Sequence, residues 1–160
     1  MSVLVIRHAL SRANDHKDSL AFGRAEAGLM EKGVHQAVHL GKVLGGLYRI
    51  NIESQTVAVS EMYRTQQTAR VAGFKCIQIN PKLNEVASGI SKTEIRKYLD
   101  NKIVPKPALK AAENILKTPP PEDVWFAHGL VIAGLSHILG IAEGRRFIPE
   151  FCEIRDMEIR

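Results

Sequence analysis

Cysteines, aromatic residues and long apolar runs are all scarce in this chain of 160 residues. Two cysteines are too few for the disulfide framework of a small secreted domain, and we expect Cys76 and Cys152 to be buried thiols rather than a disulfide pair. The longest later apolar stretch, residues 130–142, is interrupted by polar residues and is too short to span a bilayer. The first apolar run is too short for a secretory signal and ends at Arg7. These absences predict a cytoplasmic protein that does not associate with membranes.

Positive charge is in modest excess, since 22 Lys and Arg residues against 17 Asp and Glu residues give a formal net charge of +5. Such an excess suits either nucleic acid or small anionic substrates. Basic motifs interleaved with aromatic residues are missing, so we favour anionic substrates over nucleic acid. With 45% hydrophobic residues the chain can bury one substantial core, which predicts a single domain over residues 1–160. The sequence leaves the oligomeric state open.

Strand-like and helix-like patterns alternate along the chain. Short apolar runs predict strands at residues 3–6, 56–59, 76–79 and 124–127, with a closing strand within 147–154. Helical spacing of apolar residues predicts helices near 34–47, 62–72, 93–99, 108–116 and 131–139, the second of them ended by Gly73. This alternation favours an α/β fold, a three-layer sandwich whose mostly parallel central sheet is flanked by helices.

Charged and imidazole side chains follow the predicted strands. Arg7 and His8 come directly after the first strand, Arg64 and Glu85 follow the second and third, and His128 follows the strand at 124–127. Because neighbouring parallel strands end at the same rim of a sheet, we expect these five side chains to converge there. The guanidinium group of arginine is permanently charged, and the geometry of its N–H donors matches phosphate oxygens. A neutral imidazole is a nucleophile at pH 7.

Five short segments carry polar and small residues at characteristic spacings. They are Arg7-His8 with Ser11 and Asn14; Leu29, Gly33, Gln36 and Ala37; Ser60, Arg64, Gln67, Thr68 and Ala69; Leu83, Glu85 and Gly89; and His128-Gly129. In this order they resemble the histidine phosphatase superfamily, which includes cofactor-dependent phosphoglycerate mutases and many small phosphatases. Ala9 replaces the family's glycine, so the backbone there must avoid conformations that only glycine tolerates. Gly89-Ile90-Ser91-Lys92 stands where the family often has Trp-Glu-Gly.

The resemblance implies phosphoryl transfer through a phosphohistidine, with no metal and no cofactor. His8 would be the catalytic nucleophile, and Glu85 would protonate the leaving group and then activate water. The residues expected to bind the phosphate and offset its charge are Arg7, Asn14, Arg64 and His128. The altered sequence after Glu85 leaves open whether its carboxyl group reaches the leaving group.

The resemblance favours a phosphatase, acting on a small phosphate monoester or on a phosphohistidine protein. A phosphoglycerate mutase uses an insertion before its second histidine to hold a second anionic group. Here the corresponding segment, residues 89–124, is short and lacks a Glu-Arg-x-Tyr-Gly-like sequence. Mutase-type transfer and a non-catalytic module that binds phosphoanions remain the alternatives. Lys92, Arg96 and Lys97 could recognise an anionic substrate tail, but we favour a solvated helix face. The substrate itself is not determined by the sequence.

Two other chemistries fit the sequence less well. His35 and His39 are four residues apart on one helix face, as zinc ligands can be, but the glutamate of a metalloprotease motif and a third ligand are missing. Ser11 or Ser60 could form a hydrolase triad with a histidine and Asp15, yet neither serine lies in a Gly-x-Ser-x-Gly elbow. We therefore predict neither a zinc site nor a serine hydrolase.

Overall fold

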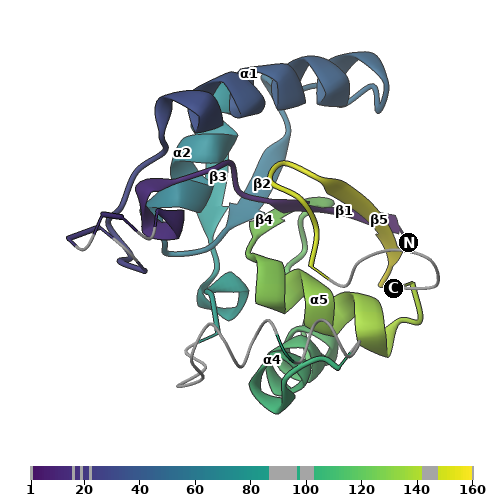
Figure 1. The fold of residues 1–160 in the computed structure, drawn as a ribbon. Helices are drawn as coiled ribbons and strands as arrows, with labels where there is room; N and C mark the ends of the chain where they lie inside the picture. The colour runs from purple at the N-terminus through teal and green to yellow at the C-terminus, as the bar shows by residue number, and fades with distance from the viewer. Residues whose placement is uncertain are drawn as a thin grey trace.

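A five-stranded sheet forms the centre of the computed structural model, which describes residues 2–15, 17–18, 20–21, 23–86, 97, 103–141 and 148–159 (Figure 1). The strands are β1 (Ser2–Arg7), β2 (Thr56–Val59), β3 (Cys76–Ile79), β4 (Val124–Ala127) and β5 (Ile154–Glu158). The helices are α1 (Glu31–Gly46), α2 (Tyr63–Ala72), α4 (Lys106–Lys117) and α5 (Gly129–Ile138), with short 3₁₀ turns η1 (Arg12–Asn14) and η2 (Pro81–Leu83). The single α/β domain confirms the predicted fold class.

The sheet has the order β3-β2-β4-β1-β5, and only β5 runs antiparallel to its neighbour. Strands β1 and β4 lie inside the sheet, which is why both are nearly continuous apolar runs. Their register pairs Arg7 with Ala127. The next residue after each strand is a histidine, so His8 and His128 leave the sheet side by side.

Helices cover both faces of the sheet: Figure 1 shows α1 and α2 on one side and α4 and α5 on the other. Because successive side chains of a strand point to opposite faces, β1 contributes to both cores. Val3 and Val5 pack into the core that α4 and α5 complete. Leu4 and Ile6 pack into the core that α1 and α2 complete. The two cores together fix β1, and with it the residues that follow β1.

Most of the predicted boundaries match the structure. Strands β2, β3 and β4 occupy the predicted residues, and α2 ends at Gly73, whose φ of 112° lies in the region that favours glycine. Helix α4 starts earlier than predicted because Pro107 is tolerated in a first helical turn. Helix α5 begins directly after His128. The helix predicted at 93–99 falls outside the described residues, apart from Lys97.

The closing strand predicted within residues 147–154 is wrong. β5 begins at Ile154 and alternates buried and exposed residues, with Arg155 and Met157 pointing inward. Residues 149–153 form a turn that packs beside Arg7. The apolar side chains of this turn therefore pack at the end of the sheet beside Arg7, and strand pairing with β1 begins only at Ile154.

The two cysteines are both free, but they differ in exposure. Cys76 is exposed because β3 is an edge strand, so the prediction of a buried thiol is wrong there. Cys152 is partly buried, and this burial raises its pKa to about 12. In the described part of the chain no helix is both long enough and apolar enough to cross a membrane.

Candidate active site

The two histidines that follow β1 and β4 face each other at the end of the sheet. Their ring centroids are 5.1 Å apart, and His8 and His128 are 1% and 0% exposed. Arg64, from the first turn of α2, reaches the same place, where its Nε lies 3.3 Å from Nε2 of His8. The structure thus brings together three of the five side chains whose convergence the strand ends predicted. The other two are Arg7, which directly precedes His8, and Glu85, whose charge acts on Arg7 and Arg64.

His8 is held as a neutral imidazole with one defined tautomer. Its Nδ1 lies 2.7 Å from the carbonyl oxygen of Ala9, which can only accept, so Nδ1 carries the proton. Nε2 therefore keeps its lone pair and accepts from Arg64. Burial, together with the charges of Arg64 and Arg7, lowers the pKa of His8 to about 3. At neutral pH Nε2 is therefore unprotonated, and its lone pair could attack once it gives up the hydrogen bond from Arg64.

The backbone after His8 is anchored by the two helices that pack on it. The amide of Ala9 donates to Oγ1 of Thr68 at 3.0 Å, and the amide of Leu10 donates to Oε1 of Gln36 at 2.9 Å. Gly33 lies against Leu10, and a Cβ there would come within 1.9 Å of the Leu10 carbonyl oxygen. These contacts explain why Gly33, Gln36 and Thr68 occur at their positions in the sequence.

Ala9 fits its position without strain. Among the described non-glycine residues only Arg49 and Cys152 have a positive φ, so Ala9 avoids the backbone conformations that glycine alone tolerates. Its side chain is fully buried. The departure from the family's glycine therefore leaves the path of the chain after His8 intact.

Arg7 directly precedes His8 in the chain and is oriented by the turn before β5. Its Nη1 donates to the carbonyl oxygen of Pro149 at 2.7 Å, and its Cζ is 4.0 Å from the centroid of the Phe151 ring. Its Nε is buried and has no partner among the described residues. Burial lowers the pKa of Arg7 and of Arg64, while the nearby charge of Glu85 opposes this effect. Both remain cations at physiological pH.

Glu85 is placed by a short 3₁₀ turn after β3. Leu83 is fully buried and anchors the turn, and Asn84 ties it to the end of β2: its Oδ1 accepts from the Glu61 amide at 2.8 Å, and its Nδ2 donates to Oε2 of Glu61 at 2.6 Å. The amide of Val86 donates to Oε1 of Glu85 at 3.0 Å. The adjoining residues 87–96 lie outside the described part of the chain.

The electrostatic surroundings of Glu85 suit a proton donor. Burial raises the pKa of its carboxyl group, and the Val86 amide, Arg64 and Arg7 act in the opposite direction. A raised pKa keeps the proton on a carboxyl group at higher pH than usual, as general acid catalysis near neutral pH requires. Glu85 therefore lies near enough to Arg64 and Arg7 for their charges to affect its pKa.

His128 is oriented by a serine that sequence reasoning did not assign. Nε2 of His128 and Oγ of Ser60 are 2.8 Å apart, and Oγ of Ser60 is in turn 2.8 Å from Oγ1 of Thr65. Nδ1 of His128 is buried without a partner among the described residues. Burial and the neighbouring His8, Arg64 and Arg7 lower the pKa of His128 well below its usual value. The position of Ser60, four residues before Arg64, was the signal in the sequence that could have identified it.

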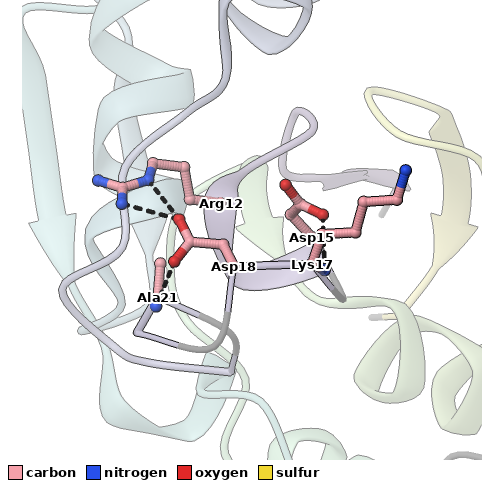
Figure 2. A network of polar contacts seen from close by, with 5 residues as sticks. All are labelled: Arg12, Asp15, Lys17, Asp18 and Ala21. Atoms are coloured by element: carbon pink, nitrogen blue, oxygen red, sulfur yellow. Dashed lines mark hydrogen bonds and ion pairs between the residues drawn. The ribbon is translucent and has the colours of Figure 1, made fainter.

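Ser60 and His128 do not form a serine hydrolase site. A triad needs a carboxylate on the far nitrogen of the histidine, and that nitrogen, Nδ1, has no partner in the part of the chain that the structure describes. Asp15, the carboxylate considered for such a triad, accepts from the amide of Lys17 at 2.9 Å (Figure 2). Oγ of Ser60 also accepts from the amide of Met62 at 3.1 Å and is buried. These contacts support a structural role for this serine.

Asn14 belongs to the loop after His8. Its Oδ1 accepts from the amide and from Oγ of Ser11, at 3.1 and 2.8 Å, so Nδ2 is the group that can bind a phosphate oxygen. Figure 2 shows the contacts that order the adjacent loop: Arg12 donates twice to Asp18, at 3.0 and 2.8 Å, and Asp18 accepts from the amide of Ala21 at 3.1 Å. The loop is held by its own polar contacts.

Comparison with known proteins identifies the family to which this fold belongs. Residues 3–106 match the family model described as the histidine phosphatase superfamily (branch 1). The sequence matches none of the curated proteins.

Solved structures from several bacteria share the fold. A protein of Thermus thermophilus superposes with a TM-score of 0.69 at 17% identity, covering 98% of this chain and 92% of its own. The product of the reading frame Rv3214 of Mycobacterium tuberculosis has a TM-score of 0.66 at 23% identity, covering 97% and 89%. An Escherichia coli K-12 protein provisionally assigned as an alpha-ribazole-5'-P phosphatase has a TM-score of 0.61 at 20% identity, covering 99% and 96%.

Proposed function

Because the chain belongs to the histidine phosphatase superfamily, we propose that it hydrolyses a phosphate monoester, or a phosphohistidine, through a covalent intermediate on His8. The observation that carries this proposal is the state of His8. Its Nδ1 proton is bound to the Ala9 carbonyl, its Nε2 lone pair is free of a proton, and two arginines lie beside it. A neutral nucleophile next to fixed cations is what attack on a phosphate dianion requires.

In the first half-reaction, Nε2 of His8 attacks the phosphorus and the bond from phosphorus to the ester oxygen breaks. Glu85 gives its proton to the departing oxygen, so the product leaves as an alcohol. Arg7 and Arg64 bind the equatorial phosphate oxygens and offset the charge that develops on them. Nδ1 of His128 and Nδ2 of Asn14 are neutral groups that can donate further hydrogen bonds to the same oxygens.

In the second half-reaction, the ionised Glu85 accepts a proton from water as the water oxygen attacks the phosphorus. The bond between phosphorus and Nε2 breaks, inorganic phosphate leaves, and His8 returns to its neutral form. Glu85 ends with its proton restored. One carboxyl group therefore serves as acid and then as base, and the cycle closes without a metal ion or cofactor.

The substrate we favour is a monoester of an ordinary alcohol. Such esters have a poor leaving group and need the proton that Glu85 would supply. The name given to the E. coli neighbour, alpha-ribazole-5'-P phosphatase, is in line with this substrate class. The most direct experiment is a panel of alkyl monoesters, a phosphohistidine protein and 3-phosphoglycerate, each assayed with the wild type and with His8→Ala. Release of inorganic phosphate by the wild type alone would support a phosphatase.

The same panel separates the two alternatives. A mutase would convert 3-phosphoglycerate to its isomer without releasing a matching amount of phosphate. A regulatory module that only binds phosphoanions would show saturable binding and no turnover with any ester. Either result would replace the phosphatase assignment.

Exhaustive chelation is expected to leave turnover unchanged, because arginine side chains supply the positive charge that a metal ion would otherwise provide. Inorganic phosphate, vanadate and tungstate are expected to compete with the substrate, since each can occupy the same cationic site. Initial rates after dialysis against a chelator, with and without added Mg²⁺ or Zn²⁺, check the first expectation. A requirement for an added divalent ion would contradict it and would direct attention to His35 and His39.

Glu85→Gln is expected to slow alkyl monoesters much more than p-nitrophenyl phosphate, because p-nitrophenolate can leave without a proton. The comparison is made on kcat/KM, which includes only the steps through formation of the phosphoenzyme when that step is irreversible. As pH rises through the raised pKa of Glu85 the acid is lost, so the alkyl ester should also show an alkaline decline that the variant lacks.

The matched control for this experiment is Glu113→Gln, which changes an exposed carboxylate on α4. It should behave as the wild type with both esters. Equal losses on the two esters in Glu85→Gln would count against proton donation by Glu85, and no loss on either would assign the acid to another residue.

A further inference from the structure

The turn at residues 149–153 holds Arg7 by both its backbone and its side chain. The Arg7 amide donates to the carbonyl oxygen of Glu153 at 3.2 Å, and the amide of Cys152 donates to the Arg7 carbonyl at 3.0 Å. The side chain donates to the carbonyl oxygen of Pro149 at 2.7 Å. This turn lies beyond residues 3–106, where the family model matches. It is therefore a feature of this chain that the family assignment does not describe.

Phe151 lies at the centre of this turn and contacts Arg7, the last residue of β1, and His8, which follows it. Its ring centroid is 4.0 Å from Cζ of Arg7 and 5.9 Å from the ring centroid of His8. A guanidinium over an aromatic face at this distance is a cation–π contact, which strengthens when the pair is removed from water. Arg7 is mostly buried here, and burial is the main cause that lowers its pKa. The ring thus stabilises the guanidinium of Arg7 through its face and occupies none of its N–H donors.

The backbone of the turn is strained at Cys152, directly after Phe151. Cys152 has a φ of 59°, in the left-handed region that side chains other than glycine rarely adopt. A conformation of this kind is unfavourable for a non-glycine residue and persists where the surroundings impose it. The amide bond from Cys152 to the Arg7 carbonyl is one such constraint.

A partly buried ion pair supplies the second constraint on the turn. Glu153 accepts from Nε of Arg155 at 3.0 Å through one oxygen and from the amide of Glu150 at 2.8 Å through the other. Arg155 is only 2% exposed and its Nη1 donates to Oγ of Ser136 at 2.7 Å. The turn is therefore braced against α5, and Phe151 is held in a fixed position beneath Arg7.

We propose that Phe151 is a positioning residue, whose ring holds the Arg7 guanidinium in the orientation that binds a phosphate oxygen. This inference rests on the proposed function of Arg7 as a phosphate-binding residue. With Nη1 bound to Pro149 and one face covered by Phe151, Arg7 keeps Nε and Nη2 for the substrate, and Nε is the buried donor that has no partner in the described part of the chain. The ring acts on the substrate through Arg7.

The test compares Phe151→Leu with Phe151→Tyr. Leucine keeps an apolar side chain but removes the aromatic face, whereas tyrosine keeps the face. We expect Phe151→Leu to lower kcat/KM about fivefold to thirtyfold, the scale of a cation–π contact that is shielded from water, and to weaken competition by inorganic phosphate in parallel. Phe151→Tyr should stay within about twofold of the wild type. Equal activity of the leucine variant and the wild type would overturn the proposal.

A double-mutant cycle with Arg7→Gln shows whether the ring acts through Arg7. In the Arg7→Gln background, Phe151→Leu should change kcat/KM and phosphate binding by about twofold or less, because the group that the ring positions is gone. The same loss in both backgrounds would mean that Phe151 acts independently of Arg7, and the proposal would be wrong. Thermal unfolding of each variant checks that the fold is retained. If the leucine variant does not fold, Phe151→Met provides the same comparison.

The outcome is separable from that of the proposed function. If the wild type turns over no phosphoester, phosphatase activity fails, while phosphate binding by the wild type and the Phe151 variants still tests the contact with Arg7. If turnover depends on His8 but is indifferent to Phe151→Leu, the phosphatase stands and the positioning role is rejected.

Discussion

His8→Ala is expected to abolish turnover, with a loss of about 10⁴-fold or more, because no other group can form the phosphoenzyme. His8 has the properties that this role requires. Its Nδ1 proton is committed to the Ala9 carbonyl, and burial with two neighbouring arginines lowers its pKa to about 3, so Nε2 stays unprotonated at neutral pH. Brief incubation with a phosphorus-labelled substrate should leave label on His8 of the wild type, and this label should be labile in acid and stable in base.

His35→Ala is the matched control for His8→Ala. His35 is an exposed histidine on α1, and its loss should change neither turnover nor labelling. This control also tests the zinc alternative, which would require His35 together with His39. Label on a serine, or turnover that survives His8→Ala undiminished, would remove His8 from the mechanism.

Arg64→Ala is expected to lower turnover by about two to three orders of magnitude, the effect of removing preorganised charge stabilisation from a transition state. Arg64 is 5% exposed, and its Nε faces the Nε2 atom of His8 at 3.3 Å, where the phosphorus must approach. The prediction is checked by steady-state kinetics together with the affinity for vanadate, which should fall as well.

Arg64→Lys should be nearly as damaging as Arg64→Ala. A lysine lacks the planar fork that lets one side chain face His8 through Nε and contact the Arg24 carbonyl through Nη1, 3.3 Å away. Arg70→Ala provides the control, because Arg70 lies on the same helix, α2, but is exposed. Near-normal turnover of Arg64→Ala would show that the phosphate binds elsewhere.

Hydrophobic pattern alone determined most of the architecture. The short runs at 56–59, 76–79 and 124–127 are strands in the structure. In β2 and β4 the apolar residues are buried, as expected of strands inside a parallel sheet. Helical spacing located α1, α2, α4 and α5 to within a few residues. Since these elements alternate, a mostly parallel sheet covered by helices follows from their order.

The sequence also indicated where the candidate site would lie. Parallel strands end at one rim, so residues that follow β1 and β4 had to be neighbours, and His8 and His128 are. Local sequence could not indicate the contacts that give these side chains their properties. The partner of His128 is Ser60, 68 positions away, and only packing brings the two together.

The C-terminal part of the chain shows most clearly what the tertiary structure decided. Residues 147–154 have the composition of a strand, yet pairing begins only at Ile154, and residues 149–153 form a turn that contacts Arg7. An aromatic side chain such as Phe151 can pack in a sheet core or against a cation, so composition does not distinguish the two. Exposure was likewise decided by position in the sheet: Cys76 has a strand pattern, but β3 lies at the edge of the sheet and most of its residues are exposed. Pattern thus determined which segments form elements, and packing determined which side chains meet.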